Sequence, residues 1–130
     1  MNKKEILTPV SVGELVDKIT ILKIKVIKIT EQTKLNNIQK ELDLLLAVCH
    51  HNNINLNLPE VNELQKCNQQ LWDIEDELRE KEHLKQFDEP FIELARKVYI
   101  TNDRRAAIKK QINIQTGSAL VEEKSYKSYS

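Results

Sequence analysis

Three polar side chains interrupt the apolar stripe of a helix predicted for residues 89–115. Because consecutive residues of a helix are about 100° apart, Asn102, Arg105 and Lys109 fall on the face that the apolar residues before them occupy. That face also carries Phe91, Leu94, Ala95, Val98 and Ile112. An amide, a guanidinium and an ammonium each cost several kcal/mol when they are buried without partners. The stripe therefore predicts that this end of the helix either leaves the core or faces a polar partner or pocket.

A second polar stripe runs along the helix predicted for residues 59–86. Glu75, Arg79 and Glu82 follow one another at i, i+4 and i+7 and lie beside Trp72. One interpretation is a solvated face, in which each ion pair contributes a few tenths of a kcal/mol. The other is that this stripe faces residues 102–113 and forms a buried network or a lined cavity with them. The indole of Trp72 favours the second interpretation, because an indole beside polar groups often walls a site or an interface.

The two stripes together define a candidate ligand-binding site between the third and fourth predicted helices. In it, Arg79, Arg105 and Lys109 would hold an anion, and Glu75 would act as acid or base in an enzymatic version. The pattern does not identify an established catalytic residue. The full candidate set is Trp72, Glu75, Arg79, Glu82, Asn102, Arg105, Lys109 and Asn113.

The sequence carries no motif for a metal, a cofactor or a nucleic acid. Cys49 and Cys67 lack a metal-binding spacing, and the neighbours His50 and His51 point about 100° apart on a helix. We therefore expect no metal and no cofactor. A basic cluster at residues 104–110 has neither interleaved aromatic residues nor a recognised motif, so binding to nucleic acid is not expected.

The composition is that of one helical domain. The chain has 130 residues, balances 20 basic against 20 acidic residues, and contains 5% aromatic residues and two glycines. So few glycines and aromatic residues argue against a β-rich protein with many turns. The first residues form neither a signal peptide nor a membrane span, and we therefore expect a cytoplasmic protein.

Capping signals and heptad spacing divide the chain into four long helices. Ser11 and Glu14 form a capping box that starts a helix over residues 12–30. Asp88 is the expected N-cap of the fourth helix, and Gly117 is its expected end. The helices are predicted at about 12–30, 34–51, 59–86 and 89–115, with a mobile tail at 118–130. The predicted fold class is all-α, either a helical bundle or an antiparallel coiled coil within a single domain of residues 1–130.

The first helix predicts self-association. It has one apolar face with heptad spacing, which includes Leu15, Ile19 and Leu22. A second face carries Val16, Ile24 and Ile27. A bundle of this size has little interior in which to bury both faces. We therefore expect a homo-oligomer, with a dimer as its simplest form.

Three segments resemble a family of bacterial and phage proteins catalogued as a domain of unknown function, DUF6165. The segments are residues 10–25, 68–82 and 91–126, and their most specific motifs are GELVDK, LWDIED and YITNDRRAAIK. The resemblance covers nearly the whole chain and implies an intracellular helical protein, often met near surface-polysaccharide genes. It carries over no catalytic residue.

Two functional hypotheses follow. The first is a non-enzymatic helical binding or assembly module with a protein partner, linked to a surface-polysaccharide pathway. The second is a small-anion site or small helical enzyme between the third and fourth helices. A weaker likeness to the helical chorismate mutases, small bundles that bind a dianion through Arg, Lys and Glu, accompanies this second hypothesis. The chain departs from their pattern because its first helix contains no arginine.

Overall fold

The computed structural model describes residues 3–129, which form four helices and no β-strand. The helices are α1 (Val12–Lys28), α2 (Gln32–His51), α3 (Pro59–His83) and α4 (Glu89–Thr116). The predicted all-α fold of four long helices is confirmed, and each observed boundary lies within a turn of the predicted one. None of the helices in the described part of the chain is long and apolar enough to cross a membrane.

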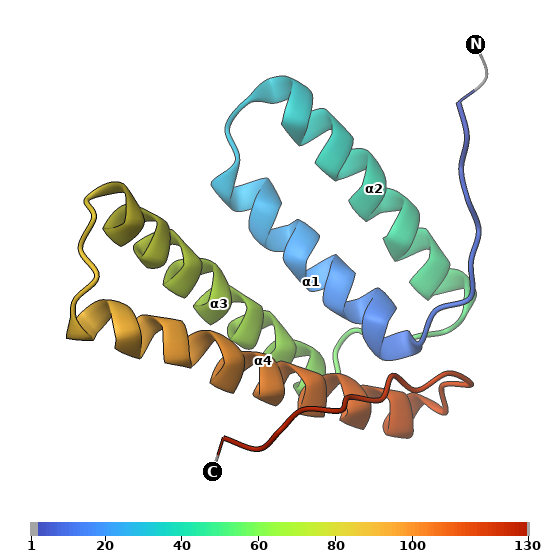
Figure 1. The fold of residues 1–130 in the computed structure, drawn as a ribbon. Coiled ribbons are helices and arrows are strands. Elements are labelled where there is room, and N and C mark those ends of the chain that lie inside the picture. Colours follow the sequence, from blue (N-terminus) through green and yellow to red (C-terminus); the bar gives the residue numbers. More distant parts are fainter. Residues whose placement is uncertain (1–2, 130) are drawn as a thin grey trace.

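The four helices are arranged as two hairpins, α1–α2 and α3–α4 (Figure 1). Helix α2 packs against α1 alone, whereas α1 also contacts both α3 and α4. Helix α1 is therefore the central element through which the two hairpins are joined.

Two apolar clusters lie on different sides of α1. The cluster shared with α2 consists of Leu15, Ile19, Leu22, Leu42 and Cys49. The cluster shared with α3 and α4 consists of Val16, Val61, Leu64, Cys67, Ile108 and Ile112. Most of both apolar faces of α1 is therefore covered within one chain, whereas Ile27 at the end of the second face is 79% exposed.

The predicted caps form at three helix ends. In the capping box of α1, however, the reciprocal bond from the Glu14 side chain to Ser11 is not made in the described part of the chain. The Ser11 hydroxyl accepts a hydrogen bond from the Glu14 N–H at 3.0 Å, and Asp88 accepts one from the Phe91 N–H at 3.1 Å. Gly117 ends α4 in the left-handed conformation, with φ of 66°. The Glu14 carboxylate pairs with Lys109 of α4 at 2.7 Å, and no bond from it to Ser11 occurs within residues 3–129. The sequence signal for a cap thus also marks a contact between two helices.

Gly13 allows the first turn of α1 to lie directly on α4. Its N–H donates to the Asn113 side-chain oxygen at 2.6 Å. A Cβ at this position would lie 2.6 Å from the backbone oxygen of Lys109, closer than two such atoms can approach. No other residue type fits there without moving the helices apart.

Residues 118–129 turn back after α4 and run beside it (Figure 1). The start of this tail is held by Ser118, whose hydroxyl accepts a hydrogen bond from the Val12 N–H at 3.1 Å. The Ser118 N–H donates to the Asn113 backbone oxygen at 2.9 Å. The tail therefore begins at the same junction of α1 and α4 that contains Gly13.

The two glycines allow a matched test of this close approach. Gly13→Ala should destabilise the fold by about 1–3 kcal/mol through overpacking. It should cost about 1 kcal/mol more if the bond to Asn113 is lost. Gly117→Ala is the control, because no atom of residues 3–129 lies within 4 Å of its added Cβ. Only the left-handed backbone is strained there, at about 1–2 kcal/mol. Urea unfolding should rank Gly13→Ala as the less stable variant, and the reverse order would contradict the close approach.

Candidate functional site

The polar stripe of α4 meets a carboxylate of α1. Arg105 donates to both oxygens of Asp17, with Nε–Oδ1 at 2.9 Å and Nη2–Oδ2 at 2.5 Å. The side chain of Asp17 is 3% exposed and that of Arg105 is 28% exposed. A forked arrangement of this kind is among the strongest hydrogen-bonded ion pairs in proteins. It connects the first hairpin to the second.

Helix α3 completes the surroundings of Asp17. The Asn68 amide donates to Asp17 Oδ1 at 2.9 Å and to the Thr20 hydroxyl oxygen at 2.8 Å. The Thr20 hydroxyl in turn donates to the Asp17 backbone oxygen at 2.7 Å. Asp17, Thr20 and Asn68 are all buried, so a single buried network contains polar groups of α1, α3 and α4. These additional bonds help offset the cost of removing the charges from water.

Lys109 lies on α4 one helical turn after Arg105, and three carboxylates surround it. Its Nζ is 2.7 Å from Glu14, 3.4 Å from Glu122 of the tail and 3.8 Å from Asp17. The side chain is only 12% exposed, so its charge is neutralised mainly by protein groups.

The two asparagines of the stripe lie at its ends. The Asn102 side-chain oxygen accepts a hydrogen bond from Arg105 Nη1 at 3.4 Å, and Asn113 receives the N–H of Gly13. The predicted stripe of Asn102, Arg105, Lys109 and Asn113 therefore does face polar partners, and most of these belong to α1.

The electrostatics of the site favour its charged state. The hydrogen bond to Asp17 raises the pKa of Arg105 above its usual value, although burial opposes the shift. The pKa of the Glu122 carboxyl is lowered, chiefly by its hydrogen bond with Lys124. Burial raises the pKa of the nearby Cys67 thiol, against the opposing charges of Arg104 and Arg105. Cys67 is thus a neutral thiol near neutral pH and not an activated nucleophile.

The stripe on α3 does not join this site, contrary to the prediction. Glu75, Arg79 and Glu82 are exposed, and Trp72 is half-buried. The nearest cation to Glu82 is Lys85 of its own hairpin, at 3.4 Å. Within residues 3–129 neither Glu75 nor Arg79 forms an ion pair, so the alternative interpretation of a solvated face is the correct one.

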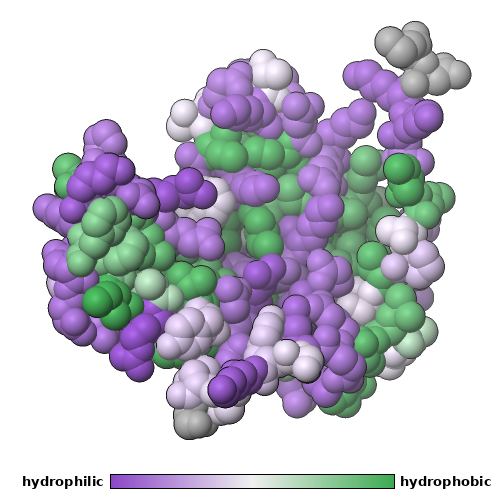
Figure 2. Space-filling view, viewed as in Figure 1, coloured by the Kyte–Doolittle hydropathy of each residue, from purple (hydrophilic) through white to green (hydrophobic). Residues whose placement is uncertain are grey.

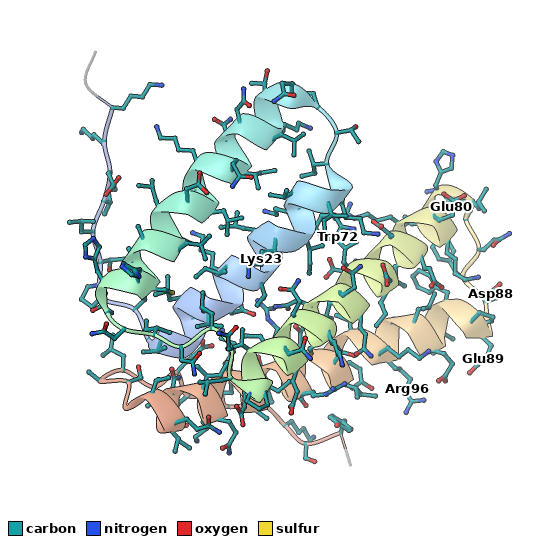
Figure 3. All side chains as sticks on the ribbon, turned by 180° about the vertical axis from the view of Figure 1, so that it is seen from behind. Lys23, Trp72, Glu80, Asp88, Glu89 and Arg96 are labelled. Carbon is teal, nitrogen blue, oxygen red and sulfur yellow. The ribbon has the colours of Figure 1, made fainter. Side chains whose placement is uncertain are left out.

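The antiparallel register of α3 and α4 explains this separation. The Cys67 thiol donates to the Thr101 backbone oxygen at 3.4 Å, and Lys81 is 3.3 Å from Asp88. Glu75 therefore lies opposite a residue near position 94, about 11 residues or roughly 17 Å along the axis from Arg105. The stripe also begins on the side of α3 that faces α1, and Figure 3 shows Trp72 between α3 and the end of α1.

Four residues of the network were missed in the sequence: Gly13, Asp17, Thr20 and Asn68. A detectable signal was present for each of them, and that of Asn68 is its place on the polar stripe of Trp72 and Glu75. On a helix, Gly13, Asp17 and Thr20 share a sector of about 100° with Val16 and Ile24. An acid in an apolar stripe of α1 is the counterpart of the cations in the apolar stripe of α4.

The arrangement is suited to holding helices together more than to acid–base chemistry. The guanidinium and the ammonium each hydrogen-bond to a carboxylate, and Cys67 is a neutral buried thiol. In the described part of the chain no three His, Cys, Asp or Glu side chains are grouped so that they could hold a metal ion.

Comparison with known proteins identifies a family. The model of a family of unknown function, DUF6165, matches residues 6–129. The chain matches no curated protein and no solved structure.

Substituting the two arginines of the candidate set should have different effects on the stability of the protein. Arg105→Ala leaves Asp17 buried without its cation and should reduce the free energy of unfolding by about 3–5 kcal/mol. Arg79→Ala, the matched control, changes an exposed residue of the same type and should unfold like the wild type. Chemical denaturation followed by circular dichroism measures both, and equal stability of the two variants would contradict the assigned network.

Proposed function

We propose that this chain, which belongs to the family of unknown function DUF6165, is a non-enzymatic helical assembly module of the cytoplasm that pairs with a second copy of itself. The observation that carries the proposal is a cluster of apolar side chains at the turn between α3 and α4. We name it the tip cluster, and it consists of Leu84, Phe87, Phe91 and Ile92.

The tip cluster exposes large apolar side chains on an element that projects from the core. Leu84 is 52% exposed, Phe87 55% and Ile92 48%. The rings of Phe87 and Phe91 pack edge to face, with centroids 5.2 Å apart and planes at 87°. Figure 2 shows apolar side chains on the lobe that contains this end of the hairpin. Exposed aromatic pairs favour an interface, because aromatic residues are enriched in interface cores.

The charges around the tip cluster favour a second copy as the partner. The rim contains three ion pairs, Lys81–Asp88, Lys85–Glu82 and Arg96–Glu93. Figure 3 places Glu80, Asp88, Glu89 and Arg96 around this end of the hairpin. A two-fold axis brings the same patch of both subunits together, so a rim with both signs can match acids with bases of its own copy.

The network around Asp17 supports a non-enzymatic role. Arg105 and Lys109 connect α4 to α1 through ion pairs with Asp17 and Glu14. Glu75, the expected acid or base, lies on an exposed part of α3 far from them. On the family resemblance alone, we extend the proposal to a protein assembly that serves a surface-polysaccharide pathway.

The proposal predicts that the tip cluster controls the oligomeric state. Leu84→Ser with Phe87→Ser removes two large apolar side chains, each of which contributes roughly 1.5–3 kcal/mol when fully buried. Dimerisation should therefore weaken by at least about a hundredfold, which sedimentation velocity measures. Ile114→Ser is the matched control, because Ile114 is 62% exposed near the opposite end of α4.

Wild type and Ile114→Ser should both be dimers at high micromolar concentration, while the double variant is a folded monomer. A monomeric wild type would contradict self-association. A dimer that survives in the folded double variant would show that the interface lies elsewhere.

A further inference from the structure

The C-terminal tail lies along the polar stripe of α4 and carries charges of its own. Glu122 is 3.4 Å from Lys109, and Glu123 is 3.6 Å from Lys110. Lys124 pairs with Glu122, and its Nζ lies 6.0 Å from the centroid of the Tyr126 ring. Further along, the rings of Tyr129 and Tyr99 are 5.5 Å apart. The tail is thus fastened to α4 at both ends, with Lys124 and Tyr126 between the fastened points.

A cavity of about 230 Å³ lies between α4 and this part of the tail. Its lining consists of Asn102, Arg105, Ala106 and Lys109 from α4, and of Lys124 and Tyr126 from the tail. The lining therefore contains three cations, an amide and a phenol ring, and it includes no carboxylate. Ala106 contributes only a methyl group to the wall, which leaves room between the polar side chains.

The carboxylates that neutralise these cations come from outside the cavity lining. Asp17 and Glu14 belong to α1, and Glu122 precedes the lining residues of the tail. The cations are thus held in place by groups that do not line the cavity itself. Preorganised donors of this kind bind a ligand at little cost in side-chain entropy.

Donor groups in the lining have hydrogen-bonding capacity left. A guanidinium has five N–H donors, and three bonds of Arg105 are made with Asp17 and Asn102. The side-chain oxygen of Asn102 accepts one of these bonds, while its NH₂ group donates to no residue among 3–129. An oxyanion is the ligand type that accepts such bonds.

We propose that the cavity between α4 and the tail binds a small anion through a phosphate or carboxylate group. Arg105, Lys109 and Lys124 line the site with N–H donors, and the Asn102 amide donates a hydrogen bond. Tyr126 forms the outer wall. Because two lining residues belong to the tail, the bound anion also holds the tail against α4.

The Lys-Ser-Tyr repeat of the tail provides a matched pair of variants. Lys124 lines this cavity, whereas Lys127, the corresponding residue of the second copy, lines a different one. Both lysines are exposed, so neither Lys124→Ala nor Lys127→Ala should disturb the helical core. Loss of one hydrogen bond to a charged group, as in Lys124→Ala, should lower the affinity for the anion by about tenfold or more.

The experiment measures thermal unfolding with increasing sodium phosphate or sodium malonate, against sodium chloride at equal ionic strength. Wild type and Lys127→Ala should gain melting temperature with phosphate, malonate or both, beyond the effect of chloride. Lys124→Ala should need at least about tenfold more of the same anion. A response equal to that of chloride, or one that Lys124→Ala retains in full, would overturn the site.

Limited trypsin digestion gives a second readout that does not depend on global stability. Cleavage after Lys127 in the wild type should slow in phosphate or malonate, because the anion holds the tail on α4. Unchanged cleavage would overturn this part of the proposal. Vesicles of phosphatidylglycerol provide a third arm, and cosedimentation that free phosphate abolishes would identify a lipid headgroup as the source of the anion.

This inference stands apart from the proposed self-association. The tip cluster lies at the other end of α4, so the melts and digestions can be repeated in the Leu84→Ser, Phe87→Ser variant. An anion response that persists in this variant supports the site whatever the oligomeric state of the wild type.

Discussion

The ion pair between Asp17 and Arg105 determines how the two hairpins lie against each other. A buried charge is tolerated only where its partner and its hydrogen bonds are all in place. Asp17 is 3% exposed, so α1 must lie where Arg105 can reach both carboxylate oxygens. The absence of a side chain at Gly13 and the bonds from Asn68 follow from the same requirement, because they let three helices approach one carboxylate.

The position of this contact also explains what remains exposed. The junction lies near the start of α1 and in the second half of α4, so the turn of the α3–α4 hairpin extends beyond it (Figure 1). No helix among residues 3–129 covers the tip cluster there, and its apolar side chains remain available to another molecule. At the opposite end the tail returns to the junction, where Glu122 adds a third carboxylate near Lys109. The position of the Asp17–Arg105 contact thus leaves the first turns of α4 exposed at the tip cluster, while the tail covers the end of α4.

Much of the fold could be predicted from the sequence because its signals are local. Ser11, Asp88 and Gly117 act within one helical turn, and their caps form as predicted. The stripe of Asn102, Arg105 and Lys109 correctly predicted polar partners, but the wrong helix was expected to supply them. That choice depends on the register of α3 against α4, which is set by packing between residues distant in sequence. The cavity at Lys124 could not be predicted either, because the short tail has neither a helical nor a strand periodicity that would indicate where it lies.

A double-mutant cycle on Asp17 and Arg105 tests most directly whether this pair joins the hairpins. The free energy of unfolding is measured for the wild type, Asp17→Ala, Arg105→Ala and the double variant. If the pair is a buried contact between hairpins, the two single losses should exceed the loss in the double variant by about 1–3 kcal/mol. Losses that add to within about 0.5 kcal/mol would contradict it, because they would mean that the two residues stabilise the protein independently.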